Sequence, residues 1–180
     1  MLDIARSIHE EAAPGKILLV EHQPVFTAGR ATPAVDRTDA VVPIERGGQI
    51  TYHGPGQLVV YPIVPLPSHD ARAWLRSLEA FGIAICAEFG LPATASDDGT
   101  GVFVHGQKVG SIGVALRRWV NLHGIALNVD MDLEPFHRVQ PCGLDPRIMS
   151  DLSRLSGRRL HWEDAADAAI RQLERLGYAG

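Results

Sequence analysis

Lysine and cysteine are scarce in this sequence of 180 residues, which holds two of each. The two cysteines, Cys86 and Cys142, lie in such different contexts that they do not indicate a disulfide framework, and we expect a reducing, cytoplasmic compartment. A basic excess is also missing, since the net charge is −4. General nucleic-acid-binding proteins normally carry a basic excess, so we expect no nucleic-acid partner.

Long hydrophobic runs and metal-binding spacings are absent as well. No stretch approaches the roughly 20 apolar residues that a helix needs to cross a bilayer, and the acidic amino terminus resembles neither a secretory signal nor a transit peptide. We therefore expect no membrane association. The eight histidines form no His-x-x-x-His pair, and the cysteines form no Cys-x-x-Cys pair. The phosphate-binding motif G-x-x-x-x-G-K-S/T is missing too, so we expect no metal and no cofactor.

The composition is otherwise that of an ordinary globular protein, with 46% hydrophobic and 21% charged residues. Such a length suits one compact domain over residues 1–180. Apolar residues at helical spacing predict helices over residues 2–12, 68–90 and 164–176, with Ser68 capping the second. Apolar and β-branched runs predict strands over residues 16–22, 41–45, 58–66, 100–106, 108–116 and 119–129, the last three as an antiparallel meander. The predicted fold class is α+β, with helices packed over a mixed, mostly antiparallel sheet.

Glycine and proline mark the expected turns and loops. We expect FTAGR, residues 26–30, to close the first strand in a turn, and residues 130–145 to form an irregular loop. Pro43 favours an edge or an end for its strand. The stretch RGGQITYHGPGQLVVY, residues 46–61, carries glycines at 47, 48, 54 and 56. Either it forms tight turns at strand ends, or something approaches its main chain closely.

Cys142 is a candidate nucleophile because it lies between a proline and a glycine in HRVQPCGLDP. The proline fixes the backbone before the thiol, and the glycine lets a substrate approach after it. Cys86 has apolar neighbours at helical spacing and is interpreted as a core residue. A thiol with a pKa of about 8.5 is mostly protonated at neutral pH, so Cys142 needs a base or a neighbouring cation.

Two kinds of partner for Cys142 are available. Lys108 lies in HGQKVGSIG among glycines and before an apolar strand, and its ammonium held beside Cys142 would favour the thiolate. The alternative is a cysteine–histidine pair, for which the candidates are His53, His105, His123 and His137. The residues alone leave both possibilities open.

Four segments in order, RGGQITYHGPGQLVVYPI, KVGSIGVAL, HGIALNV and PCGL, resemble the lipoyl(octanoyl) transferase family. The similarity extends from EHQPVFTAGR near residue 21 to MSDLSRL near residue 155. The resemblance implies a fold like the catalytic domain of lipoate and biotin protein ligases. It also implies transfer of an octanoyl group from acyl carrier protein to a lysine of lipoyl domains.

The resemblance further assigns roles to residues. It makes Cys142 the acyl-thioester nucleophile and Lys108 the group that lowers the thiol pKa and shuttles protons. It implies that the acyl and thioester site is lined by Arg46, Gly47, Gly48, Gln49, Ile50, Thr51, Tyr52, His53, Ser111, Ile112, Gly113, Gly124, Ile125 and Ala126. The N–H groups of the glycines at 47, 48, 54 and 56 are expected to help stabilise an oxyanion. Phe103 departs from the tryptophan that the family often has in this strand.

The resemblance also implies a donor and acceptors, and alternatives stand beside it. The expected donor is octanoyl-acyl carrier protein, and the expected acceptors are apo lipoyl domains of 2-oxoacid dehydrogenase E2 subunits and the glycine cleavage H protein. We expect a monomer, with the arginine pairs at 117–118 and 158–159 as possible docking points for acidic partners. The alternatives are an ATP-dependent lipoate-protein ligase on the same fold, a non-catalytic binder of acylated carrier domains, and a thioesterase.

Overall fold

A six-stranded antiparallel sheet is the largest element of the fold. The computed structural model describes residues 1–10, 13–34, 40–66, 68–95, 100–139 and 145–176. The sheet has the order β1-β5-β9-β8-β7-β6. Its strands are β1 (Lys16–Val20), β5 (Gln57–Ile63), β9 (Val120–Asn128), β8 (Gln107–Arg117), β7 (Gly101–Val104) and β6 (Ala93–Ala95). The predicted meander is confirmed, because β7, β8 and β9 are consecutive antiparallel neighbours.

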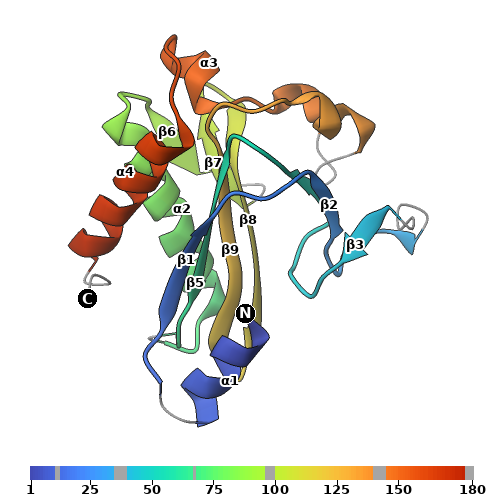
Figure 1. Ribbon diagram of the computed structural model, residues 1–180, viewed down its shortest axis with the longest axis vertical. Helices are drawn as coiled ribbons and strands as arrows, with labels where there is room; N and C mark the ends of the chain where they lie inside the picture. Colours follow the sequence, from blue (N-terminus) through green and yellow to red (C-terminus); the bar gives the residue numbers. More distant parts are fainter. Residues whose placement is uncertain (11–12, 35–39, 67, 96–99, 140–144, 177–180) are drawn as a thin grey trace.

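A second, smaller sheet lies to one side of the first (Figure 1). Its order is β3-β2-β4, with strands β3 (Val41–Pro43), β2 (Val25–Ala28) and β4 (Ile50–His53). Strand β2 pairs in parallel with β3 and antiparallel with β4. Pro43 ends an edge strand, as predicted. One expectation was wrong here, because FTAGR contributes to β2 instead of forming only a turn. The glycine-rich stretch also contains β4, a strand that the sequence did not predict. The rings of Phe26 and Tyr52 pack across these strands, 5.2 Å apart, and this contact is not visible in the local sequence pattern.

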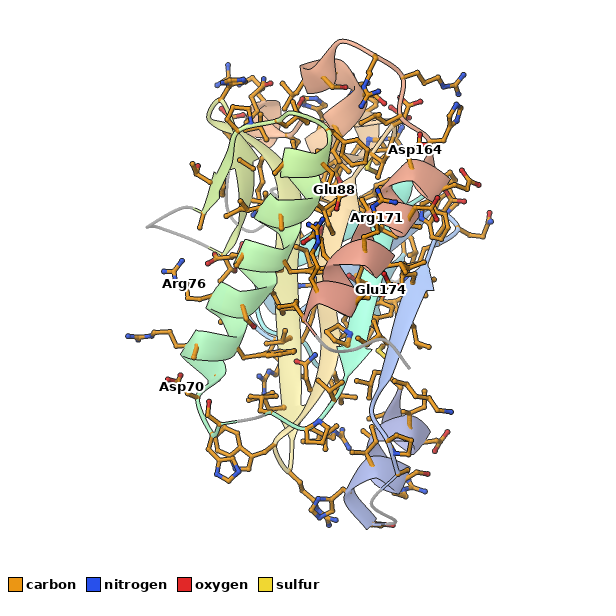
Figure 2. All side chains as sticks on the ribbon, turned by 90° about the vertical axis from the view of Figure 1, so that its left-hand side faces the viewer. Asp70, Arg76, Glu88, Asp164, Arg171 and Glu174 are labelled. Carbon is orange, nitrogen blue, oxygen red and sulfur yellow. The ribbon has the colours of Figure 1, made fainter. Side chains whose placement is uncertain are left out.

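Two long helices, α2 (Ala71–Glu88) and α4 (Trp162–Arg175), cover one face of the large sheet (Figures 1 and 2). Arg171 of α4 reaches Glu88 of α2 with a 2.6 Å ion pair, which joins the two helices. The predicted cap Ser68 was wrong, because Asp70 precedes the first helical residue and its Oδ1 accepts from the N–H groups of Arg72 and Ala73. An ionised carboxylate at this position satisfies two donors that the helix leaves unpaired.

The remaining helices are short. They are α1 (Leu2–Glu10), α3 (Leu152–Ser156) and the 3₁₀ turns η2 (Glu134–Arg138) and η4 (Pro146–Ile148). Helix α1 packs through Ala5 and Ile8 against the hairpin end of β8 and β9. Phe136 of η2 meets Tyr52 of the small sheet edge to face, with ring centroids 5.8 Å apart. In the part of the chain that the structure describes, no helix combines the length and apolar character needed to cross a membrane.

Alternation along β5 separates the two faces of the large sheet. Leu58 and Val60 join the main core beneath α2, whereas Val59 and Tyr61 point to the opposite side. Side chains in a strand alternate with a period of two, so one strand serves both the core and the other face. The face opposite the long helices is therefore available to build a site together with the small sheet.

Candidate active site

A cavity of about 210 Å³ lies between the large sheet and the small sheet, on the face opposite α2 and α4. Strands β5, β8 and β9 supply one wall, and β2 and β4 supply the other. The predicted residues that line it are Arg46, Thr51, His53, Ser111, Ile112, Gly113, Gly124, Ile125 and Ala126. Segments far apart in the sequence thus meet around one largely apolar space.

Glycines on two neighbouring strands shape the floor of the cavity. Gly113 and Gly124 face each other across β8 and β9. A Cβ atom at Gly124 would collide with the carbonyl oxygen of Val60, and one at Gly113 would lie 2.9 Å from Cδ of Arg46. The absence of a side chain at both positions therefore permits the close approach of β5 on one side and of Arg46 on the other.

Arg46 is a buried guanidinium that fixes the glycine-rich loop to the small sheet. Its Nη1 donates to the carbonyl oxygens of Gly47 at 3.0 Å and Gln49 at 2.7 Å. Its Nη2 donates to the carbonyl and hydroxyl oxygens of Thr27, at 3.0 and 2.9 Å. Hydrogen bonds from a charged donor contribute about 1.5–3 kcal/mol each. Arg46 therefore both lines the cavity and holds its wall in place.

The other predicted lining residues lie beside the cavity instead of on its wall. They are Gly47, Gly48, Gln49, Ile50 and Tyr52. Ile50 is 5% exposed and pairs with Ala28 across the small sheet. Tyr52 packs in a separate cluster with Phe136 and Met149. These residues support the loop and the segment from 130 to 139, and their placement gives them no contact with the cavity itself.

Two of the expected oxyanion donors are already engaged within the protein. The N–H of Gly47 donates to the carbonyl oxygen of Val114 at 2.9 Å, and the N–H of Gly56 donates to Oε1 of Glu21 at 2.8 Å. Gly56 has a φ of 81°, and a Cβ atom there would collide with the carbonyl of Asp130. The expectation was therefore wrong for these two N–H groups, and Gly56 is required by a close approach of main chains.

His53 is held by a line of hydrogen-bonded amides. Its Nδ1 lies 2.7 Å from Oε1 of Gln57, whose Nε2 donates to Oδ1 of Asn128 at 2.9 Å. Nδ2 of Asn128 donates in turn to the carbonyl oxygen of Ser150 at 2.9 Å. Because an amide oxygen only accepts, this network assigns the ring proton of His53 to Nδ1 and leaves Nε2 as an acceptor. Burial lowers the pKa of His53 to about 4, so the ring is neutral at physiological pH.

The neutral imidazole of His53 predicts a loss of stability in acid. The pKa of His53 is 6.5 when unperturbed and about 4 in the folded protein, so between these values the unfolded state binds more protons. We expect the free energy of unfolding to fall by about 2–3 kcal/mol as the pH drops through this window, at 1.36 kcal/mol per pKa unit. Burial also lowers the pKa of His22 and His123, which adds to the effect.

Urea unfolding of the wild type and of His53→Asn across this pH window measures the contribution. The asparagine keeps a donor for Gln57 but does not titrate, so its stability should depend less steeply on pH. An equally steep dependence in the variant would assign the acid sensitivity to other groups.

Three of the lining residues that the resemblance did not assign carry polar rings. They are His22, Tyr61 and His123. Nε2 of His22 lies 2.8 Å from the hydroxyl of Tyr61, and the ring of His123 meets Tyr61 edge to face at 6.2 Å. His123 has a φ of 63°, in the left-handed region that costs a side chain about 1–2 kcal/mol. Alternation in residues 58–63 could have identified Tyr61, but nothing in the local pattern marks His123.

The full set of lining residues outside the prediction is mixed in character. It comprises Met1, His22, Val25, Thr27, Ile44, Val59, Tyr61 and His123. The apolar members come from the amino terminus, β2, β5 and the segment before Arg46. They complete the apolar part of the cavity wall.

A β-bulge directs Lys108 away from the main core. Phe103 pairs with Lys108, but Val102 pairs with Gly110, so β8 has one extra residue here. Without it, alternation would put position 108 on the face of Ile112, which packs into the core beneath α2. Instead Cε of Lys108 lies against Gly101, where a Cβ atom would be 2.8 Å away. Bulges of this kind commonly redirect side chains next to functional sites.

The ammonium of Lys108 is enclosed, with the residue 3% exposed. Its Nζ donates to the carbonyl oxygen of Thr100 at 3.4 Å and lies 5.7 Å from the ring centroid of Phe103. The main chain of Lys108 pairs with Met149, and its carbonyl oxygen accepts from the N–H of Ser150 at 3.0 Å. Strand β8 therefore carries Lys108 and, from residue 111 onward, part of the cavity wall. It also pairs with the segment that follows Cys142 in the sequence.

Cys142 itself lies outside the described residues. Cys86 is completely buried and burial raises the pKa of its thiol to about 12, which confirms the prediction of a core residue.

Of the candidate histidines, His53 and His123 line the cavity, whereas His105 and His137 are exposed. Among the residues that the structure describes, no group of three or more His, Cys, Asp or Glu side chains could hold a metal ion.

The predicted basic pairs lie at opposite ends of the large sheet (Figure 1). Arg117 and Arg118 end β8 near α1 and form ion pairs with Glu45 and Glu10, at 2.7 and 3.6 Å. Arg159 follows α3 and pairs with Asp130 at 3.0 Å. The two pairs therefore do not form one docking surface.

Comparison with known proteins gives one consistent family. Residues 2–174 match the lipoyl protein ligase A/B catalytic domain. An octanoyltransferase of Pelobacter propionicus is 42% identical over 159 residues, which cover 86% of this chain and 76% of the relative. An octanoyltransferase of Pseudomonas fluorescens is 40% identical over 173 residues, which cover 93% and 80%.

Solved structures agree with this chain in fold. A crystal structure of lipoate-protein ligase A bound with ATP has a TM-score of 0.80 at 15% identity, covering 97% of this chain and 78% of that one. The biotin protein ligase of Aquifex aeolicus has a TM-score of 0.50 at 14% identity, covering 67% and 52%. At this level of identity the comparison establishes the fold alone. The predicted α+β fold, like that of lipoate and biotin protein ligase catalytic domains, is confirmed.

Proposed function

Because this chain belongs to the lipoyl protein ligase A/B catalytic domain family, and relatives at 40–42% identity are octanoyltransferases, we propose that it is an octanoyltransferase acting in protein lipoylation. It moves an octanoyl group from octanoyl-acyl carrier protein to the target lysine of a lipoyl domain. The intermediate is a thioester on Cys142. The observation that carries this proposal is the enclosed Lys108 on the strand that continues into the wall of the largely apolar cavity.

The first half of the reaction loads the enzyme. The Cys142 thiolate, paired with the Lys108 ammonium, attacks the carbonyl carbon of the octanoyl thioester. The bond from that carbon to the pantetheine sulfur breaks, and the departing thiolate takes a proton from Lys108. The products are octanoyl-Cys142, free pantetheine thiol and a neutral Lys108 amine.

The second half passes the acyl group on. Neutral Lys108 takes a proton from the ammonium of the acceptor lysine, whose amine then attacks octanoyl-Cys142. An amide bond forms, the carbon–sulfur bond to Cys142 breaks, and the proton lost by the new amide goes to the sulfur. Release of that proton to solvent restores the thiolate and ammonium pair.

The cavity supports an acyl chain as cargo. Its apolar side chains include Val25, Ile44 and Val59. Burial of an alkyl chain contributes about 0.8 kcal/mol per CH₂, so an eight-carbon chain gains several kcal/mol in such a space. The neutral state of His53 avoids a buried charge beside this chain.

We also propose the acceptor proteins, the oligomeric state and the cellular compartment. The acceptors are the lipoyl domains of 2-oxoacid dehydrogenase E2 subunits and of the glycine cleavage H protein, and the chain acts as a monomer and one catalytic domain. The cysteine usage supports a reducing, cytoplasmic compartment. The ligase alternative shares the fold but activates a free acid with ATP, so nucleotide dependence separates the two reactions.

The test is a transfer assay with defined carriers. Purified chain is mixed with octanoyl-acyl carrier protein and an apo lipoyl domain, and the acceptor mass is followed with and without ATP. We expect the lipoyl domain to gain one octanoyl group at the same rate in both. Transfer from free octanoate that requires ATP would establish the ligase, and release of free octanoate with an unmodified acceptor would establish a thioesterase.

A further inference from the structure

A fully buried carboxylate lies on α2, outside the cavity. Glu79 is 1% exposed. Its Oε2 lies 2.7 Å from Nη1 of Arg76, one turn earlier on the helix. Its Oε1 accepts from the N–H of Gly101 at 3.3 Å, at the start of β7. Acidic side chains are rarely so completely buried unless they are paired, and this one is paired with a main-chain group as well as with a cation.

The N–H that Glu79 binds belongs to the same peptide unit as the carbonyl that Lys108 binds. The peptide bond joins the carbonyl of Thr100 to the N–H of Gly101. Its carbonyl oxygen accepts from Nζ of Lys108 at 3.4 Å, while its N–H donates to Glu79. A Cβ atom at Gly101 would lie 2.8 Å from Cε and 3.3 Å from Nζ of Lys108, so the lysine side chain lies directly against this peptide.

The charges of Glu79 and Lys108 are both oriented favourably relative to the dipole of the Thr100–Gly101 peptide. A peptide unit has a dipole of about 3.5 D with its positive end at the N–H and its negative end at the carbonyl oxygen. The carboxylate of Glu79 faces the positive end, and the ammonium of Lys108 faces the negative end. Successive hydrogen bonds of this kind polarise one another, so the anion strengthens the bond that the carbonyl accepts.

We propose that Glu79 is a positioning residue for Lys108 and acts through the Thr100–Gly101 peptide. It fixes the carbonyl that orients the ammonium and favours the charged form of the lysine. This inference rests on the proposed function, because the position of Lys108 matters only if Lys108 takes part in acyl transfer.

Other charged groups lie around these hydrogen bonds. Arg76 partly offsets the charge of Glu79, but its side chain is 55% exposed and lies on the outer side of α2 (Figure 2). Asp151 and Arg154 form a second ion pair at the start of α3, just after the residues that pair with the main chain of Lys108. Cys142 supplies the thiolate in the proposed mechanism.

The decisive variant is Glu79→Gln, which keeps an acceptor for the N–H of Gly101 and removes the charge. Acyl-enzyme formation from octanoyl-acyl carrier protein is measured against pH by mass spectrometry under single-turnover conditions. We expect the alkaline limb, where the ammonium is lost, to move down by about one pH unit, because the variant removes an anion that favours the charged form of the lysine. We expect kcat to fall about tenfold with KM unchanged.

Two further variants separate positioning from structural support. Arg76→Gln leaves the charge of Glu79 uncompensated, so the alkaline limb should move to higher pH, opposite to Glu79→Gln. Glu88→Gln removes another acid of α2 that pairs with an arginine, and it should leave the profile unchanged. A structural role alone would lower the melting temperature of Glu79→Gln without moving its limb.

The outcomes distinguish this inference from the function on which it rests. A wild-type profile in both Glu79→Gln and Arg76→Gln, or a shift of the same sign in both, overturns the role of Glu79 and leaves the transferase intact. If Glu79→Gln does not fold, the sign of the shift in Arg76→Gln decides alone. If the wild type forms no acyl-enzyme, the proposed function fails, and the inference fails with it.

Discussion

Replacement of Cys142 by serine is expected to reduce octanoyl transfer by at least about 10³-fold, because the acyl group then has no thiolate to carry it. A serine hydroxyl is far less acidic than a thiol, and the Lys108 ammonium does not ionise it. Transfer rates from octanoyl-acyl carrier protein to an apo lipoyl domain measure the effect.

Cys86 offers the matched control for this loss. It is buried in the main core with its thiol pKa raised to about 12, so Cys86→Ala should lower stability by a modest amount and leave transfer largely intact. Near-normal turnover by Cys142→Ser would contradict the thioester mechanism and favour direct transfer between the two carriers.

Replacement of Lys108 by methionine should have the next largest effect. Methionine keeps much of the length of the side chain but removes the charge and the proton. General acid–base catalysis typically contributes about 10²–10⁴-fold, so we expect kcat to fall by about that factor. The pH–rate profile should lose its alkaline limb, since no ammonium is left to titrate.

Two variants control for this change. Lys108→Arg keeps a cation that cannot give up its proton, so it should preserve thiolate formation better than proton transfer. Lys16→Met removes the other lysine, which is exposed on β1, and should leave the rate unchanged. A pH–rate profile of Lys108→Met identical in shape to that of the wild type would contradict its role.

Much of the fold could be predicted from local pattern. The apolar run from residue 58 to 66 predicted a strand, and β5 occupies most of it, between β1 and β9. The spacing of Trp74, Leu78, Phe81 and Ile85 indicated α2, because these side chains form its buried face. The strands β2 and β4 were missed because each is only four residues long and ends directly before a glycine. Contacts between Phe26 and Tyr52, far apart in the sequence, hold them together.

The residues of the site likewise divide into those that local motifs predict and those that depend on contacts distant in the sequence. Contiguous motifs led to Ser111, Gly113 and Gly124, because the resemblance covers unbroken stretches of sequence. The bulge that redirects Lys108 and the left-handed backbone of His123 depend on pairing between strands, which no local pattern reports. The role of Glu79 was not predictable from the sequence either. The spacing of Glu79 and its i, i+3 pair with Arg76 are those of an ordinary helix glutamate, and only the approach of β7 gives it the N–H of Gly101 as a partner.

The most direct test of the thioester account is the mass of the intact protein after mixing with octanoyl-acyl carrier protein. The account predicts a gain of one octanoyl group on Cys142, and loss of that group to an apo lipoyl domain added afterwards without ATP. An enzyme that remains unmodified while the lipoyl domain becomes octanoylated would contradict the covalent intermediate.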